Sequence, residues 1–160
     1  MSQESDRKAF ADLMNTYAGP MRRLCAAYAN GSDREDLFQN IFLAVWRALP
    51  AFRGDSSPRT WLYRIAHNVA LTWQRRDRRR QSRETALNED VQPSAQMDLR
   101  TLALSQAIAS MSPGDRTLTL LWLEGLSAAE IEDVTGVKSA TVAVRLSRIR
   151  KQLSPVEITV

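Results

Sequence analysis

Hydrophobic residues recur every three or four positions along most of the chain, which is the spacing of one face of an α-helix. The first such stripe covers Phe10–Tyr28 and is interrupted by Gly19-Pro20, where we expect a kink or a break because proline has no amide hydrogen. Ser32 or Asp33 can cap a second helix, whose stripe covers Leu37–Leu49. The chain therefore begins with two amphipathic helices.

A third stripe covers Trp61–Trp73, after a loop at Phe52–Ser56. Ser57-Pro58 stands directly before this stripe, and a capping serine followed by proline in the first turn is a common helix start. Each of the three helices has one apolar face to bury, so together they predict a three-helix bundle.

The hydrophobic period lapses after this helix and resumes near the C-terminus. Residues 81–97 are polar and show no sustained period, so they are the best candidate for a flexible linker. The period resumes at Leu99, and Ser112-Pro113 starts another helix. The sequence thus predicts an all-α fold with two small helical domains, at 1–80 and 98–160.

The segment Leu126–Lys151 has the features of a helix-turn-helix. Ser127 and Glu130 have the spacing of a capping box, and Gly136 can supply the tight turn before a second helix that Ser139 can cap. That second helix has one apolar stripe and a basic outer face, which suits a helix that enters the major groove of DNA. The alternative is a helical hairpin that only packs on its neighbours, and the basic outer face favours DNA.

A second basic surface lies far from the helix-turn-helix. Six arginines fall within positions 75–83, at the end of the helix that carries Trp61 and Trp73. Aromatic rings stack on unpaired bases and guanidinium groups neutralise phosphates, so this combination suits strand-separated DNA. Alternatively, both tryptophans belong to the core and the arginines form a solvated helix end that the helix dipole favours. Two separate surfaces suggest a protein that reads two DNA elements at once.

The composition excludes several other classes of protein. A net charge of +4 over 160 residues fits a polyanionic partner. Cys25 and His67 are the single cysteine and the single histidine, so we expect neither a disulfide within the chain nor a zinc site, and we interpret Cys25 as a small buried hydrophobe. There is no phosphate-binding loop and no nucleophile–base pair, so neither an enzyme nor a cofactor is expected. With no apolar run of membrane-spanning length and no signal-peptide core, we expect a soluble, cytoplasmic protein.

Two blocks of sequence resemble the extracytoplasmic function (ECF) sigma factors, group IV of the bacterial sigma-70 family. The blocks comprise Asp33–Gln39, Phe42–Pro50, Phe52–Ser57 and Thr60–Ala66, and then Leu123–Ser127, Thr141-Val142, Arg145-Leu146 and Arg148–Arg150. They occur in the family's order, and the match extends from Phe10 to Leu153. The resemblance implies an initiation factor, itself no enzyme, that binds core RNA polymerase and directs it to promoter DNA, commonly under the control of an anti-sigma factor.

The resemblance also implies roles for individual residues. The helix at 35–49 would dock on the clamp helices of the largest polymerase subunit, through Asp36, Leu37, Gln39, Asn40 and Phe42. The following loop, with Arg53, Gly54, Asp55 and Ser56, and Asn68 would form the pocket for a flipped-out base of the melted −10 element. The aromatic and basic surface of the next helix adds Trp61, Arg64, Trp73, Arg75 and Arg76 as candidate −10 contacts. The second helix of the helix-turn-helix would read the −35 element, through Lys138, Ser139, Thr141, Val144, Arg145 and Arg148.

Three positions depart from the family's pattern. Asn40 stands where an acidic residue is usual, so the contact with polymerase would be weaker or adjusted. Ala143 and Val144 stand where many relatives have a polar or basic pair. Apolar side chains cannot donate hydrogen bonds to bases, so these residues would contact thymine methyl groups, or the −35 element would be read through DNA shape and phosphates.

Two other functions remain open on the sequence alone. A stand-alone helix-turn-helix regulator would explain residues 126–151 but leaves 33–66 without a role. A sigma mimic that titrates an anti-sigma factor would need the protein-binding faces but not the arginine clusters. Co-purification with core polymerase and a steep fall of DNA binding with salt would distinguish these functions from that of a sigma factor.

Overall fold

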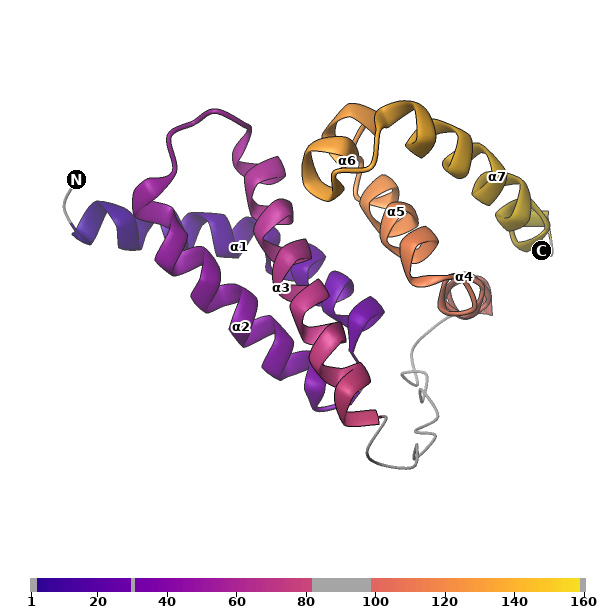
Figure 1. Ribbon diagram of the computed structural model, residues 1–160, viewed down its shortest axis with the longest axis horizontal. Helices are drawn as coiled ribbons and strands as arrows, with labels where there is room; N and C mark the ends of the chain where they lie inside the picture. The colour runs from indigo at the N-terminus through magenta and orange to yellow at the C-terminus, as the bar shows by residue number, and fades with distance from the viewer. Residues whose placement is uncertain (1–2, 30, 82–98, 159–160) are drawn as a thin grey trace. The chain divides into compact units, whose positions relative to one another are not determined.

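The computed structural model describes residues 3–29, 31–81 and 99–158, and the chain divides into two compact units (Figure 1). The first unit contains α1 (Gln3–Tyr28), α2 (Asp33–Ala48), the short 3₁₀ helix η1 (Leu49–Ala51) and α3 (Pro58–Gln81). The second contains α4 (Leu99–Ala109), α5 (Pro113–Leu123), α6 (Ala128–Thr135) and α7 (Ser139–Ile158). The predicted all-α fold with two helical parts is confirmed. The predicted linker lies, apart from Gln81 at the end of α3, outside the described residues, so its boundaries stay predictions.

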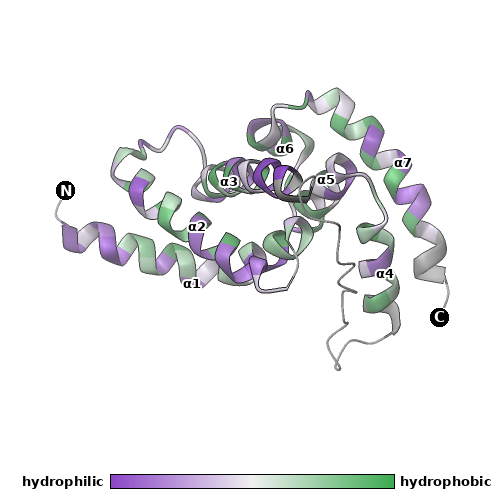
Figure 2. Ribbon diagram, turned by 60° about the horizontal axis from the view of Figure 1, so that its bottom comes forward, coloured by the Kyte–Doolittle hydropathy of each residue, from purple (hydrophilic) through white to green (hydrophobic). Residues whose placement is uncertain are grey.

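The first unit is the three-helix bundle that its apolar stripes predict. Figure 2 shows hydrophobic and hydrophilic residues alternating along α1 and α2, as expected for helices that bury one face. The largest fully buried side chains of this unit come from all three helices: Met21, Leu37, Ile41, Val45, Leu62 and Tyr63. In Figure 1, α2 and α3 run in opposite directions and are joined by a loop over one end of the bundle, which is the loop that carries several of the predicted DNA contacts.

Two details at helix starts and interruptions differ from the prediction. α1 continues through Pro20 without a break, with Met14 buried before the proline and Met21 buried after it. Packing on both sides favours one continuous helix, and Thr16, whose carbonyl would face the missing amide hydrogen, is exposed to water. Ser32 does not cap α2, because its own backbone is helical and its side chain makes no capping hydrogen bond.

The second unit packs α4 to α7 around aliphatic side chains. Those that are buried include Leu118, Leu121, Leu126, Ile131, Val134, Val142, Leu146, Ile149 and Leu153. Ser112 caps α5 as predicted, because its hydroxyl oxygen accepts the amide hydrogen of Asp115 at 3.3 Å. Among the described helices of both units, none combines the length and apolar character that crossing a membrane requires.

Candidate nucleic-acid interface

The loop between η1 and α3 is anchored at both ends. At its start, the Phe52 ring packs on the Trp61 ring with the centroids 4.7 Å apart. At its end, the hydroxyl oxygen of Ser57 accepts the amide hydrogen of Thr60 at 3.1 Å, which confirms the predicted cap of α3. The loop is therefore held by an aromatic contact with α3 and by the helix cap.

The tip of this loop presents polar groups to solvent. Gly54 has a φ of 78°, a left-handed conformation in which other residues are strained. Arg53 and Asp55 on either side are exposed, and Ser56 is half-buried. A polar tip between two fixed anchors can offer hydrogen bonds to a planar ligand such as a nucleobase.

Next to this loop, α3 turns a polar face outwards. Trp61, Arg64 and Asn68 follow each other at three- and four-residue spacing, so they share one side of the helix. Asn68 is exposed, while Trp61 and Arg64 are half-buried. Arg75, seven residues after Asn68, continues the same side and is exposed, as is Arg76 beside it. The structure thus places four of the predicted contacts along one side of α3, the helix that begins where the loop ends.

Trp73 does not lie on that polar face. It is half-buried and follows Leu62, which is fully buried, by eleven residues, or about three helical turns. This spacing places Trp73 toward the apolar side of α3. Its position agrees with the alternative that this tryptophan contributes to packing.

Along α2, the predicted polymerase contacts differ in exposure. Asp36, Gln39 and Asn40 are exposed, and Phe42 is half-buried. Leu37, in contrast, is completely buried in the bundle, so the prediction that it contacts a partner is wrong for its side chain. The one-turn spacing that unites Leu37 with Ile41 on the apolar face, seen in the sequence as part of a stripe, explains this placement.

Sequence reasoning missed an aromatic cluster at the other end of α2. Phe10 of α1 lies edge-on to Phe42, with centroids 4.4 Å apart, and to Trp46, with centroids 5.2 Å apart. Leu43 and Trp46 are 48% and 37% exposed, although the apolar stripe assigned Trp46 to the core. The sequence showed only that the apolar stripe of this helix is wide. It did not show that the stripe extends beyond the part of α2 that the other two helices cover.

The turn between α6 and α7 is built from local hydrogen bonds. The Ser127 hydroxyl oxygen accepts the amide hydrogen of Glu130, and the Glu130 carboxylate accepts that of Ser127, each at 3.2 Å, so the predicted capping box is confirmed. Gly136 ends α6 with a φ of 80°, as its predicted role requires. Ser139 is not the cap of α7 but its first residue, and its amide donates to the Glu132 carboxylate at 2.8 Å. This contact ties the start of α7 to α6.

α7 separates a buried stripe from an exposed face. The stripe consists of Val142, Leu146, Ile149 and Leu153. Thr141, Val144 and Arg148 are exposed on other faces, Lys138 is exposed just before the helix, and Ser139 is half-buried. Val144 is 71% exposed, more than the other large hydrophobic residues that reach solvent in the described part of the chain. The helix therefore offers a polar and basic surface with a valine in it.

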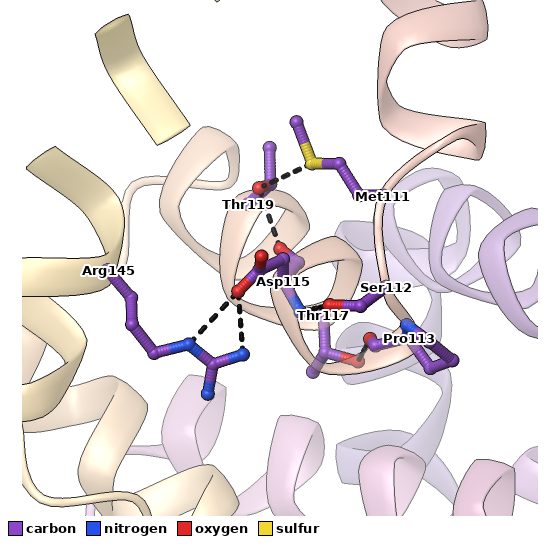
Figure 3. A network of polar contacts seen from close by, with 7 residues as sticks. All are labelled: Met111, Ser112, Pro113, Asp115, Thr117, Thr119 and Arg145. Carbon is purple, nitrogen blue, oxygen red and sulfur yellow. Dashed lines mark hydrogen bonds and ion pairs between the residues drawn. The ribbon is translucent and has the colours of Figure 1, made fainter. Parts of the chain in front are cut away.

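Arg145, one of the residues predicted to read the −35 element, forms an ion pair within the second unit. Its guanidinium donates from Nε at 3.0 Å and from Nη2 at 2.6 Å to the same carboxylate oxygen of Asp115, at the start of α5 (Figure 3). The structure thus places Arg145 in an ion pair between two helices, which its position on a basic helix did not indicate.

Cys25 and His67, which lie in the core of the first unit, have shifted pKa values. Burial raises the pKa of the Cys25 thiol to about 11, so the thiol is protonated and unreactive near neutral pH. Burial lowers the pKa of His67, and the Tyr28 hydroxyl lies 3.2 Å from its Nδ1. No group of metal-ligating side chains occurs in the part of the chain that the structure describes. Cys25 is therefore the buried small residue that the sequence predicted.

Two family models match the chain, each within one of the two units. Sigma-70 region 2 matches residues 13–80, and Sigma-70, region 4 matches residues 101–153. The ECF RNA polymerase sigma-E factor of Escherichia coli strain K12 is 33% identical over 94% of this chain and 87% of its own length. The sigma-E factor of Haemophilus influenzae is 29% identical over 94% of this chain and 88% of its own length.

Solved structures agree on the fold. The sigma factor RpoE from Bartonella quintana, in complex with the anti-sigma factor NepR, has a TM-score of 0.79 at 21% identity and covers 96% of this chain and 99% of its own. CnrH, in complex with the cytosolic domain of CnrY, has a TM-score of 0.65 at 22% identity and covers 94% and 88%. Together with the two region matches and the sigma-E relatives, these likenesses show that the chain belongs to the extracytoplasmic function sigma factors of the sigma-70 family, which are transcription initiation factors and not enzymes.

Proposed function

We propose that this sigma factor binds core RNA polymerase, directs it to promoters with a −10 and a −35 element, and opens the −10 region by capturing an unpaired base. The observation that carries the proposal is the exposed Asn68 on α3, the helix that follows a loop anchored at both ends and polar at its tip. An amide side chain can both donate to and accept from the edge of a base.

Capture of a base stabilises the open promoter, because the base is accessible only after the two DNA strands have separated. Moving a base out of the duplex costs a few kcal/mol, and contacts made only in the flipped state offset that cost. Asn68 and the loop tip at 53–56 would receive the base, and Trp61 would add ring surface. Arg64, Arg75 and Arg76 would neutralise phosphates of the melted strand. Trp73 is left out of this surface because it lies toward the apolar side of α3.

For polymerase, we propose that α2 is the docking helix. Asp36, Gln39 and Asn40 are exposed on it and can form hydrogen bonds across an interface, whereas Leu37 holds the helix on the bundle from inside. Asn40 carries no charge, so salt should weaken this contact less than it would weaken one made by a carboxylate.

For the −35 element, we propose that α7 lies in the major groove. Lys138 and Arg148 would contact phosphates or guanine, and Thr141 would contact a base edge. Val144 is too exposed to serve the core, and a thymine methyl group is the feature of a base edge that an apolar side chain recognises. We therefore expect a thymine in the −35 element opposite Val144.

We also propose that an anti-sigma factor controls this chain. The proposal rests on analogy with the Bartonella quintana relative, which was solved with its anti-sigma factor bound. A tagged chain expressed in the native cell should recover a specific protein that competes with core polymerase for it. Recovery of polymerase alone, under all growth conditions tested, would contradict this part of the proposal.

The proposed function is tested by run-off transcription with purified bacterial core polymerase on fragmented genomic DNA, with and without the chain. We expect new transcript starts that share two spaced upstream elements. As a control, Leu62→Ala removes buried volume from the first unit and should reduce these starts by lowering the fraction of folded chain. An absence of new starts with the wild-type chain, while it still binds DNA in a salt-dependent way, would refute the proposal and favour a stand-alone regulator.

A further inference from the structure

We propose that Asp115 and Arg145 form a positioning pair for the helix that reads the −35 element, so that Arg145 orients α7 and makes no contact with DNA. This inference rests on the proposed function, because it concerns how the same helix is held. It removes one arginine from the DNA-contacting surface that the sequence indicates.

The pair joins Asp115, in the first turn of α5, to Arg145, in the second turn of α7. One carboxylate oxygen of Asp115 accepts hydrogen bonds from both Nε and Nη2 of Arg145, at 3.0 Å and 2.6 Å (Figure 3). The side chains are only 27% exposed for Arg145 and 22% for Asp115, so water competes weakly for these hydrogen bonds. An arginine held in this way is directed along the protein surface rather than outwards.

The backbone that carries the Asp115 carboxylate is held in place by its neighbours in α5. The Asp115 amide donates to the Ser112 cap, and the Asp115 carbonyl accepts from the Thr119 hydroxyl at 2.7 Å. Thr119 is completely buried, and its neighbour Thr117 donates to the Pro113 carbonyl at 3.0 Å (Figure 3). The first turn of α5 is therefore a fixed point, and the ion pair connects α7 to it.

Gly114 makes room for this contact. A Cβ atom at position 114 would lie 2.9 Å from Nη2 of Arg145, closer than such atoms approach each other in proteins. The guanidinium therefore lies directly against the backbone of the first turn of α5. A side chain at 114 would compete with the position that Arg145 occupies.

Arg145 stands at the edge between the two faces of α7. Its neighbours Val142 and Leu146 are buried, whereas Val144 is exposed. Farther along the helix, the guanidinium of Arg150 lies over the Trp122 ring, 5.1 Å from the centroid. α7 is thus connected to both ends of α5, which determines its rotation about its own axis. Functional side chains on a helix tolerate only about 10–20° of misorientation, so this rotation decides which residues reach the groove.

The test uses the full chain and a duplex with the −35 element that run-off transcription defines. Arg145→Ala, Asp115→Ala and the double variant are compared at a temperature where circular dichroism shows all of them folded. We expect each single variant to bind about five- to tenfold more weakly, as for the loss of one partly shielded ion pair. The double variant should bind no more weakly than either single one, because both changes break the same contact.

The salt dependence of binding separates a positioning role from a DNA contact. A lost phosphate contact reduces the slope of log affinity against log salt by about 0.9. Arg145→Ala should leave that slope unchanged, whereas the matched control Arg148→Ala, an exposed arginine one turn away, should reduce it. A merely structural role would leave the affinity of the folded variants unchanged, so the loss of affinity at constant slope is specific to positioning.

Two results would overturn the proposal. One is a slope reduced by Arg145→Ala as much as by Arg148→Ala, and the other is tighter binding after Asp115→Ala, which would mean that the carboxylate competes with DNA for the arginine. If the alanine variants unfold, Arg145→Lys replaces them: it keeps the charge but loses the forked geometry, so positioning predicts weaker binding and a phosphate contact predicts little change. If the wild-type chain directs no transcription starts, the proposed function fails, and the same slopes are then measured on duplex of random sequence.

Discussion

The two units hold their proposed DNA surfaces by different means. In the first unit, the loop and α3 are held by apolar and aromatic packing, such as the Phe52–Trp61 contact and the buried Tyr63. In the second, polar contacts add to the buried apolar stripe of α7: the Glu132–Ser139 hydrogen bond and the Asp115–Arg145 pair connect α7 to α6 and α5, and a capping box fixes the start of α6. Loss of buried volume should therefore damage the first unit most, and loss of single polar groups the second.

The largest effect is expected from Leu37→Ala. This change leaves a cavity at a completely buried site and should reduce the free energy of unfolding by about 2–5 kcal/mol. Urea unfolding followed by circular dichroism measures it, with hydrogen exchange to show that α1–α3 open before α4–α7. Asn40→Ala, at an exposed site on the same helix, is the matched control and should leave stability unchanged. A Leu37→Ala protein of normal stability that fails to bind polymerase would restore Leu37 as a direct contact.

Asn68→Ala tests the function of the DNA surface proposed for the first unit. Losing a side chain that hydrogen-bonds a captured base should reduce open-promoter formation about tenfold or more, while binding to core polymerase stays unchanged. Permanganate reactivity of promoter thymines measures opening, and co-sedimentation measures polymerase binding. Asn15→Ala, the same change at an exposed site on α1, serves as the control. Equal loss of opening and of polymerase binding would remove Asn68 from the proposed base pocket.

A smaller effect is expected in the second unit from Ser127→Ala. This change removes the hydroxyl that caps α6 and should reduce the free energy of unfolding by about 1 kcal/mol. Hydrogen exchange should locate the loss in α6 and α7, whereas the amides of α1–α3 keep their protection. Ser127→Asp, which retains a capping oxygen, should restore most of the stability. A loss spread evenly over both units would contradict the assignment of polar contacts as local determinants of the second unit.

The smallest effect concerns pH and the first unit. Burial favours neutral His67 in the folded chain, and the unfolded chain protonates near the ordinary pKa of 6.5. Neutral His67 therefore makes its full contribution to the free energy of unfolding above about pH 6.5. That contribution is lost as the pH falls below about 6.5 toward the lowered pKa of His67. Unfolding of wild type and His67→Gln from about pH 7.5 to about pH 5.5 measures it, since most carboxyl groups titrate below this range. A parallel pH dependence in the two proteins would exclude His67 as the cause.

Local patterns in the sequence predicted most of the fold. The caps at Ser57, Ser112 and Ser127 and the turn at Gly136 were predicted correctly, because each depends on residues within one helical turn. Helix continuity at Pro20 could not be predicted, because packing on both flanks overrides the local effect of proline.

The sequence predicted which residues of the candidate site share a helix face. It did not predict which distant residues contact each other. Helical spacing placed Trp61, Arg64 and Asn68 on one face, but it could not show that Leu37 is fully buried while Asn40 is exposed until the other two helices were in place. The Asp115–Arg145 pair joins residues thirty positions apart, and no periodic pattern reports which distant carboxylate an arginine meets. The aromatic cluster of Phe10, Phe42 and Trp46 was missed for the same reason.

The division of α7 into a buried stripe and an exposed face has an evolutionary consequence. The residues proposed to read DNA, Thr141, Val144 and Arg148, are not the residues that hold the helix, Val142, Leu146 and Ile149. Substitutions on the exposed face of a helix usually change stability by less than about 0.5 kcal/mol. Promoter preference can therefore change one residue at a time without passing through an unfolded intermediate sequence, so that a duplicated copy of such a gene can acquire a new set of promoters on an unchanged scaffold.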